Sequence, residues 1–488
     1  MSRIRQRAEE AGKKTAPLAE RAIRLAKRGA YAVRGWGSAS GWFRSSFLPS
    51  QNYLIILAVV VGILTGFGSV GFILVLESIA EWAREGIAGA LEFLGPANLV
   101  LLPALGGLAA GPLIHHFARE ARGHGVPEVM TALAIRGGRI RKRVALVKII
   151  ASSFTIGFGG AAGREGPMVQ IGSAIGSSIG QAAKLTDHNI RTLVACGAAG
   201  GIAATFNAPI AGAIFAMEVL MRRIHADFLL VLLTSLSSAM IARHFLGNYP
   251  AFRVTPYELA SPGELPLYFL MGLVIGAAAI FYVKLLYRSE EWFANWQFPE
   301  WLKPAIGGLF VGLILRFFPQ VYGSGFPAMT SALYVRFSFE LLAALFVMEL
   351  IANCATLGSG GSGGVFAPSL FMGGMIGGAF GMLVHTVFPE WTGGSGAYAM
   401  VGMAAFFAAA AKAPTTSILI LFEMTNDYRI MLPLMAATVA SVYLSHQLLP
   451  HSIYTLKLFQ RGIHLPDTGD PGPARRSAPS GPEAQSAP

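Results

Sequence analysis

Residues 163–167 read Gly-Arg-Glu-Gly-Pro and lie within a long apolar region of the chain. Proline suits the first turn of a helix, so we expect a helix to begin beside Pro167. The N–H groups exposed at a helix start, together with the positive end of the helix dipole, bind anions without a full positive charge. Glu165 lies at this start, and a carboxylate there can occupy an anion site and leave it once protonated or displaced. The segment therefore predicts an anion site with Glu165 as its gate.

Glu165 has a structural alternative, which is an ion pair with its neighbour Arg164. Adjacent residues on a helix do not face each other, and this disfavours the pair. An ionisable side chain inside a membrane segment is also costly, so its presence there indicates a function. For both reasons we favour the gate.

Two further Gly-rich segments carry a proline where a helix can begin. Residues 123–127 read Gly-His-Gly-Val-Pro, and residues 363–368 read Gly-Gly-Val-Phe-Ala-Pro. Three helix starts that meet near the middle of a membrane would hold a small anion, yet loosely enough to release it. Each segment taken alone is also explained by an ordinary kink between packed helices.

The composition of the 488 residues excludes a soluble enzyme, because 53% are hydrophobic and only 13% are charged. Apolar stretches recur from residue 53 to residue 449. Lipid offers backbone groups no hydrogen-bond partner, so these stretches must be helices. Backbone broken by Gly or Pro is tolerated at membrane depth only where protein covers it or water lines it. We expect an all-α, multi-pass membrane protein whose site lies at such breaks.

The two halves of the apolar region share a pattern of spacings. Glycines follow Pro167 and Pro368 at identical intervals, and each half then carries a glycine, an Ala-Pro pair and a glutamate at matching distances. The matching residues are Gly172, Gly176, Gly180, Gly197, Pro209 and Glu218 in the first half, and Gly373, Gly377, Gly381, Gly402, Pro414 and Glu423 in the second. Gly-rich helices produce single coincidences of this kind, but chance does not explain all of them together.

The residues that follow each copy differ in charge, with Arg222 and Arg223 after the first and Asp427 after the second. Basic residues favour the cytoplasmic side, so the two copies are expected to emerge on opposite sides of the membrane. This predicts two inverted-topology helical repeats whose broken helices meet at the midplane. We assign residues 51–250 to the first membrane repeat and residues 262–457 to the second.

The two ends of the chain differ in composition from its middle. Residues 1–44 carry eleven Lys or Arg and three Glu, and this excess of positive charge makes up much of the net charge of +12 of the whole chain. Next to a membrane segment, this charge marks a cytoplasmic side and does not indicate a nucleic-acid partner. We expect residues 1–50 to be a basic cytoplasmic segment with an amphipathic helix, and residues 458–488 to be a disordered tail rich in Pro, Gly and Ser. Both termini are placed in the cytoplasm, and the protein in the plasma (inner) membrane.

Four segments of the sequence resemble the signature of the CLC chloride channels and chloride–proton antiporters. They are the Gly-rich segments at 123–127, 163–167 and 363–368, and Ser-Ile-Tyr-Thr-Leu-Lys at 452–457. The resemblance runs from about Ile56 to Gly462 and is to the prokaryotic type without C-terminal CBS domains. It implies the CLC-type fold, a gating role for Glu165, and homodimers with one pore per subunit and an interface around 207–240 and 400–425. It also implies anion-site positions at His124, Gly125, the backbone N–H groups near Gly166, Val365 and Phe366, and the hydroxyl group of Tyr454.

His124 departs from the family pattern, which commonly has serine at this position. An imidazole donates one hydrogen bond when neutral and carries charge below about pH 6.5. The sequence therefore predicts tighter anion binding or faster flux in mildly acid conditions. The alternative is a histidine that only packs against its neighbours.

Val219 is a second departure, because members that exchange chloride for protons commonly carry an inner glutamate there as a proton relay. Valine cannot carry a proton, and channel members of the family also lack the relay. We therefore predict a passive, glutamate-gated channel for chloride or a similar small anion, sensitive to voltage and pH. The alternative is an H+/Cl− antiporter with an atypical proton path through water or His124.

Other classes of protein find less support in the sequence. An intramembrane hydrolase would need a nucleophile or paired acids, and besides Glu165 only Glu218 and Glu423 lie near helix ends, too dispersed for a dyad. A cation-coupled transporter of organic solutes would need a cluster of cation ligands, which the sequence does not suggest. Cys196 and Cys354 indicate neither a disulfide framework nor a zinc site. We expect no enzymatic activity, cofactor or metal.

Overall fold

The computed structural model describes residues 50–222, 227–249, 252, 260–465 and 475–476. The amphipathic helix expected near the N-terminus falls on residues outside this described part. Within the described part the chain is helical almost throughout, and six helices are long and apolar enough to cross a bilayer. The chain is therefore an integral, multi-pass membrane protein.

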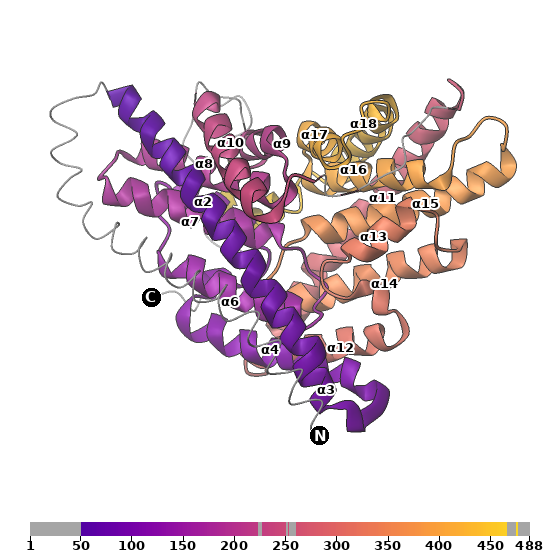
Figure 1. Cartoon of the computed structure of the whole chain (residues 1–488), viewed down its shortest axis with the longest axis horizontal. Coiled ribbons are helices and arrows are strands. Elements are labelled where there is room, and N and C mark those ends of the chain that lie inside the picture. Colours follow the sequence, from indigo (N-terminus) through magenta and orange to yellow (C-terminus); the bar gives the residue numbers. More distant parts are fainter. Residues whose placement is uncertain (1–49, 223–226, 250–251, 253–259, 466–474, 477–488) are drawn as a thin grey trace.

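The first half begins with the long helix α2 (Ser50–Glu81), which crosses the molecule diagonally in Figure 1. A π-helical turn η1 (Trp82–Ile87), a short α3 (Ala88–Ala90) and a 3-10 turn η2 (Glu92–Ala97) lead into the remaining elements. These are α4 (Asn98–Phe117), η3 (Arg119–Ala121), α5 (Val126–Ile135), α6 (Arg143–Gly157), α7 (Glu165–Ala182), α8 (Asp187–Phe206), α9 (Pro209–Phe215), η4 (Ala216–Met221) and α10 (Phe228–Leu246).

The second half repeats this order and also begins with a long helix, α11 (Glu264–Asn295), which has 32 residues as α2 does. The elements that follow are α12 (Lys303–Phe317), η5 (Pro319–Val321), α13 (Phe326–Leu333), α14 (Phe339–Gly358), α15 (Phe366–Val387), α16 (Ser395–Ala411), α17 (Pro414–Thr425), α18 (Met431–Leu448) and α19 (Thr455–Gln460). Two short antiparallel strands come last, β1 (Ile463–His464) and β2 (Arg475–Arg476).

Equivalent pairs of helices pack together in both halves. α2 packs against α10 and α7 against α8, just as α11 packs against α18 and α15 against α16. Across the halves, α4 packs against α12 and α9 against α17. Figure 1 shows most of the early helices on one side of the molecule and most of the later ones on the other. This arrangement confirms the predicted all-α fold of two helical repeats.

Glu218 and Glu423, which end the matching spacings, tie the two halves together. The carboxylate of Glu218 accepts hydrogen bonds from two backbone N–H groups at the start of α17, at 3.1 and 2.6 Å. The carboxylate of Glu423 accepts hydrogen bonds from two backbone N–H groups at the start of α9, at 3.1 and 2.7 Å. Each glutamate therefore satisfies free N–H groups in the other half, where the helix dipole favours a negative charge.

The matching glycines let helices touch backbone to backbone. A Cβ atom added at Gly172 of α7 would collide with the carbonyl oxygen of Gly197 in α8, and one added at Gly197 would collide with that of Gly172. Gly373 of α15 and Gly402 of α16 have the same relation to each other. The repeated glycine spacing thus reflects one close helix crossing that the chain builds twice.

Two long apolar stretches, 192–220 and 396–424, each contain a sharp break in the structure. Asn207 (φ 58°) separates α8 from α9, and Lys412 (φ 55°) separates α16 from α17. Both residues adopt the left-handed conformation that ends helices, so each stretch forms two helices with a turn between them.

The sequence predicts a disordered tail from residue 458 onward, and this prediction is wrong for the first residues of that segment. α19 runs to Gln460, and Ile463 lies in the strand β1, which pairs with β2. Leu458 and Ile463 are both buried in the hydrophobic core, which explains why this part of the chain is ordered. Of the later tail residues, only 475–476 belong to the described part.

Candidate functional site

The three Gly-rich segments lie against one another and are joined by backbone hydrogen bonds. The N–H group of Gly163 donates to the carbonyl of Gly364 (2.8 Å), and Gly364 donates back to Gly163 (2.5 Å). Gly123 donates to the carbonyl of Gly361 (3.0 Å), and Gly363 donates to that of Gly123 (3.3 Å). These bonds hold the starts of α5, α7 and α15 together. The predicted meeting of broken helices is confirmed.

A small cavity lies where these helix starts meet, and both halves of the chain contribute to it. Its lining residues are His124, Val126, Glu165, Gly166, Val169, Ile202, Phe215, Val365, Phe366 and Tyr454. The structure therefore brings nearly all the predicted anion-site residues together. Gly125 does not line the cavity, and its role is to begin α5, with a φ of 79° that favours glycine.

Glu165 is only 1% exposed and lies between two helix starts. Its Oε2 atom accepts a hydrogen bond from the backbone N–H of Ala367 (3.4 Å) in the first turn of α15, and its Oε1 atom has no hydrogen-bond partner within the described residues. Gly163 leaves room for the side chain, because a Cβ atom there would collide with Oε2. The carboxyl group thus occupies a position in which a helix N-terminus stabilises an anion.

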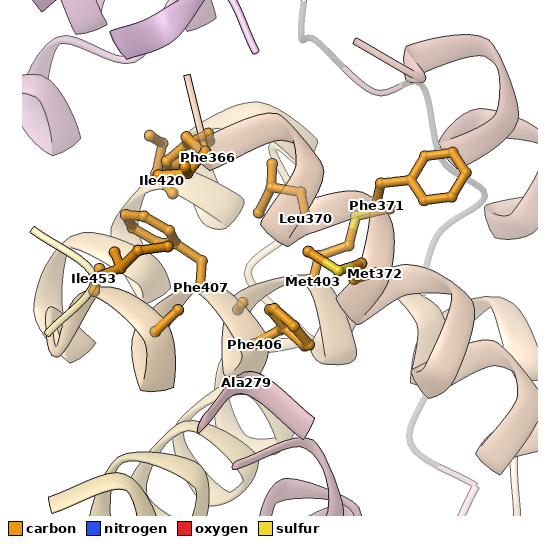
Figure 2. Close-up of a cluster of buried hydrophobic side chains, with 14 of the residues drawn as sticks. Ala279, Phe366, Leu370, Phe371, Met372, Met403, Phe406, Phe407, Ile420 and Ile453 are labelled. Atoms are coloured by element: carbon orange, nitrogen blue, oxygen red, sulfur yellow. The ribbon is translucent and has the colours of Figure 1, made fainter. Parts of the chain in front are cut away.

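Aromatic side chains form one wall of the cavity. The ring of Phe366 packs against those of Phe206 (centroids 4.8 Å apart) and Phe407 (4.3 Å). Tyr454 is buried and contacts the ring of Phe215 edge-on at 6.4 Å. Figure 2 shows Phe366 and Phe407 among the side chains of the buried apolar cluster. Because such surroundings exclude water, the few polar groups of the cavity act more strongly on an anion.

His124 is buried on the edge of the cavity. Its Nε2 atom lies 3.4 Å from the hydroxyl oxygen of Tyr287, and its Nδ1 atom has no hydrogen-bond partner within the described residues. The positive charges of Lys457, Lys148 and Arg461 act on the ring. Burial of the ring, together with these cations, disfavours a charge on the imidazole, which counts against the acid-enhanced flux that the sequence predicts.

Lys148 is a residue of this site that the sequence reasoning missed. It is fully buried in α6, and its ammonium group donates hydrogen bonds to the carbonyl oxygens of Ala121 (3.0 Å) and Gly123 (2.7 Å). These charge-assisted bonds fix the segment before His124 and place a positive charge beside the cavity. The signal was an ionisable residue inside the apolar stretch 144–161, which by itself indicates a function.

Residues 323–327, Gly-Ser-Gly-Phe-Pro, were also missed, although they repeat the Gly-x-Gly-x-Pro spacing of residues 123–127. α13 begins at Phe326, directly after the positive φ of 69° at Gly325. The guanidinium group of Arg164 lies 5.2 Å from the centroid of the Phe326 ring. The segment is the second-half equivalent of residues 123–127, and it positions the neighbour of the candidate gate.

Val219, which takes the place of the inner glutamate of exchangers, packs in the hydrophobic core and does not line the cavity. Its neighbour Glu218 is engaged with the start of α17. Neither residue offers a free group that could carry a proton to Glu165.

The fold and the cavity together define an anion-transport protein built from broken membrane helices. The family model described as "Voltage gated chloride channel" matches residues 106–446, and the chain therefore belongs to the CLC family. The H(+)/Cl(-) exchange transporter ClcA of Vibrio parahaemolyticus is 33% identical over 416 residues, which cover 82% of this chain and 88% of that protein.

Two further similarities support this membership. A ClcB-like protein of Ralstonia nicotianae, whose name places it among chloride channels, is 32% identical over 429 residues, covering 86% of this chain and 100% of its own length. The crystal structure of a slow cyanobacterial Cl-/H+ antiporter has a TM-score of 0.77 and 27% identity, and the match covers 85% of this chain and 98% of that one. The chain is a CLC-family anion transport protein.

Proposed function

We propose that this protein exchanges chloride, or a similar small anion, for protons across the membrane. The observation that carries the proposal is the position of Glu165, whose carboxyl group lies in the cavity at the first turn of α15. There it can bind a proton or, when ionised, take the place of an anion. Similar proteins named as chloride–proton exchangers support the same function, so we favour exchange over the passive channel expected from the sequence.

Competition for the helix starts would link the two ions. An anion that binds at the start of α15 displaces the carboxylate of Glu165 from the N–H group of Ala367. The displaced carboxylate then binds a proton, and it releases that proton when it returns and expels the anion. The movements of anion and proton are thereby coupled in opposite directions.

In this proposal, the anion is held mainly by dipoles. The ligands are the backbone N–H groups near Gly166, Val365 and Phe366, with the hydroxyl group of Tyr454 and an imidazole N–H of His124. Partial charges of this kind replace the hydration of the anion without binding it as tightly as a paired cation would, which allows rapid release.

The passive channel remains a second candidate, and one observation favours it. Val219 supplies no proton-carrying group where exchangers commonly have one, and the structure packs it into the core. Reversal potentials in planar bilayers separate the two functions when a pH gradient is applied with equal chloride on both sides. A channel reverses at zero voltage under these conditions, whereas an exchanger reverses at a voltage set by the pH gradient. Reversal at zero would refute the exchange.

We further propose a homodimer with one pore per subunit, in the plasma membrane and with both termini in the cytoplasm. The basic N-terminal segment supports this orientation. Figure 1 shows α9, α10, α17 and α18 side by side along the upper edge of the view, which suits the interface implied by the family. Large apolar side chains are exposed along α10 and α18 and include Leu229, Leu236, Met240, Leu432, Met435 and Val439.

A further inference from the structure

A second cavity, at the end of α4, has no role in the proposed exchange. It lies where α4 packs against the start of α12, in the lower part of Figure 1, and its charged lining consists of His115, Arg119, Arg122 and Glu300. The free space within it is about 360 Å³, including its opening to the surface, which is near the lower limit for a ligand pocket. A small charged group fits such a space, whereas a large ligand does not.

The two guanidinium groups of this cavity have no carboxylate bound to them. In the part of the chain that the structure describes, neither Arg119 nor Arg122 forms an ion pair or a hydrogen bond through its side chain. Glu300 is the one carboxylate among the described residues of the lining, and its Oε2 atom lies 3.6 Å from Nδ1 of His115. The side chain of Glu300 is 53% exposed. The lining therefore keeps an excess of positive charge, which attracts an anion to the cavity.

Closely packed backbone fixes the shape of the cavity. A Cβ atom added at Gly360 would lie 3.0 Å from Nε of Arg122, so this side chain lies directly over the glycine. Gly360 has a φ of 106°, which also favours glycine. On the opposite wall, a Cβ atom added at Gly111 of α4 would lie 2.0 Å from the carbonyl oxygen of Trp301. The cavity is therefore formed by the fold itself, and Arg122 has a defined place in it.

The donors of the lining suit a phosphate group. A guanidinium group presents several N–H donors in one plane, and this arrangement matches two oxygen atoms of a phosphate. A phosphate spreads its negative charge over several oxygen atoms, so it can bind Arg119 and Arg122 at the same time. The imidazole of His115 offers one more donor at the edge of the cavity. Chloride is a single atom and cannot form such paired contacts.

The cavity lies at the level where the membrane meets water. Two of the candidate spans, Asn98–Phe117 and Glu264–Asn295, end close to its lining residues in the sequence. Exposed aromatic side chains accompany these two ends, and Trp in particular is enriched at membrane interfaces. They are Phe117, Trp292, Trp296 and Trp301. The phosphate groups of lipids lie at this same level.

The surroundings of the cavity favour a lipid over a free phosphate ion. Residues 119–143 contain seven Lys or Arg and two Glu, which favours the cytoplasmic side, where anionic lipids attract basic segments. Basic pockets between membrane helices on that side bind lipid headgroups. Next to the cavity, α4 and α12 expose apolar side chains that acyl chains can contact. These include Leu105, Leu108, Leu309, Phe310 and Leu313.

We propose that this cavity binds the phosphate group of an anionic phospholipid between Arg119 and Arg122. The acyl chains of the lipid lie along the exposed apolar surface of α4 and α12. The site is separate from the anion cavity at Glu165, since the two cavities share no lining residue. The inference therefore does not depend on whether the protein exchanges protons for chloride.

The test measures lipid binding to the purified full chain in detergent by native mass spectrometry. The probes are phosphatidylglycerol and phosphatidylcholine with the same acyl chains, and inorganic phosphate is added as a competitor. The wild type should bind phosphatidylglycerol more tightly, because the choline group brings a positive charge toward the two arginines. Arg119→Gln and Arg122→Gln each remove one charge-assisted contact, so each should weaken phosphatidylglycerol binding by about tenfold.

Arg316 offers a matched control on the same helix. It lies at the other end of α12, where its guanidinium group contacts the ring of Phe317 at 5.7 Å. Arg316→Gln removes the same charge from the protein and should leave phosphatidylglycerol binding unchanged. Unfolding temperatures without added lipid show whether each variant folds. Arg119 is exposed, so Arg119→Gln keeps the test decisive even if Arg122→Gln is unstable.

Each other outcome overturns the proposal. Wild-type affinity for phosphatidylglycerol in a folded Arg119→Gln variant excludes the cavity as its site. Equal weakening in Arg119→Gln and Arg316→Gln assigns the effect to overall charge. Equal binding of the two lipids removes the preference for an anionic headgroup. If inorganic phosphate displaces phosphatidylglycerol at similar concentration, the cavity holds a soluble phosphate and not a lipid.

Discussion

In the proposed exchange, the anion and the proton compete at Glu165, so the charge of this residue is the first variable to change. The neutral amide in Glu165→Gln cannot ionise and cannot compete as an anion for the N–H group of Ala367. We expect chloride efflux from proteoliposomes to continue in this variant, with no proton flux and little dependence on pH. The wild type should show chloride-driven proton flux and a clear dependence of chloride flux on pH. If the variant closes the pore, Glu165 is not the gate.

The pH response at His124 follows from the charges around it. Burial of the ring disfavours its charged form, and the positive charges of Lys457, Lys148 and Arg461 add to this effect, so we expect the residue to act as a hydrogen-bond donor with one neutral N–H. Chloride flux of His124→Ser should therefore change in size but keep the pH dependence of the wild type between about pH 5 and pH 8. If chloride flux rises in acid in the wild type but not in His124→Ser, the charged imidazole predicted from the sequence is supported and the neutral one is contradicted.

Lys148 is expected to matter for anion affinity, since its ammonium group holds the carbonyl groups of Ala121 and Gly123. Methionine at this position keeps the length of the side chain but loses two charge-assisted hydrogen bonds, each worth about 1.5–3 kcal/mol. Chloride binding measured by calorimetry should weaken by about tenfold or more in Lys148→Met. Lys303 offers a matched control, because it is buried and donates to the carbonyl of Phe293 (2.6 Å) away from the cavity. Lys303→Met should lower stability without changing chloride affinity.

At the scale of helices, the two glutamate caps join elements that are far apart in sequence. Glu218 contacts the start of α17 across 197 residues. Glu218→Ala removes the acceptor for two backbone N–H groups, and loss of a helix cap costs about 1 kcal/mol. We expect a lower unfolding temperature in detergent for Glu218→Ala and a smaller drop for Glu218→Gln, which keeps an acceptor. A change in the ratio of protons to chloride in either variant would contradict a purely structural cap.

The helices also show what the sequence can and cannot predict. The repeat was predictable because Gly172 and Gly373 serve one local requirement, close helix contact, and that requirement leaves the same spacing in both halves. The cap formed by Glu218 was not predictable, because its partner is fixed by the packing of α9 on α17. The same holds for Lys148, whose acceptors at Ala121 and Gly123 come near it only in the folded protein.

At the scale of the whole molecule, the cavity belongs to neither half alone. His124 and Glu165 come from the first half, and Val365, Phe366 and Tyr454 come from the second. The backbone hydrogen bonds between the Gly-rich segments cross the same boundary. The proposed anion site therefore forms only when the two repeats dock, and the first repeat expressed alone would lack the N–H groups of α15.

Dimer formation is the prediction that concerns the outer surface. Leu432 lies in the apolar row on α18 and is 61% exposed, so in the proposed homodimer a partner would cover it. Tryptophan there remains compatible with lipid but is too large for a close interface, so Leu432→Trp should lower the dimer fraction in cross-linking and in size-exclusion chromatography. Leu313 on α12 is 54% exposed and lies outside the proposed interface, so Leu313→Trp serves as the control and should leave the dimer intact. Since each subunit would carry its own pore, the monomeric variant should keep chloride–proton exchange. A dimer weakened by Leu313→Trp and not by Leu432→Trp would place the interface on another face.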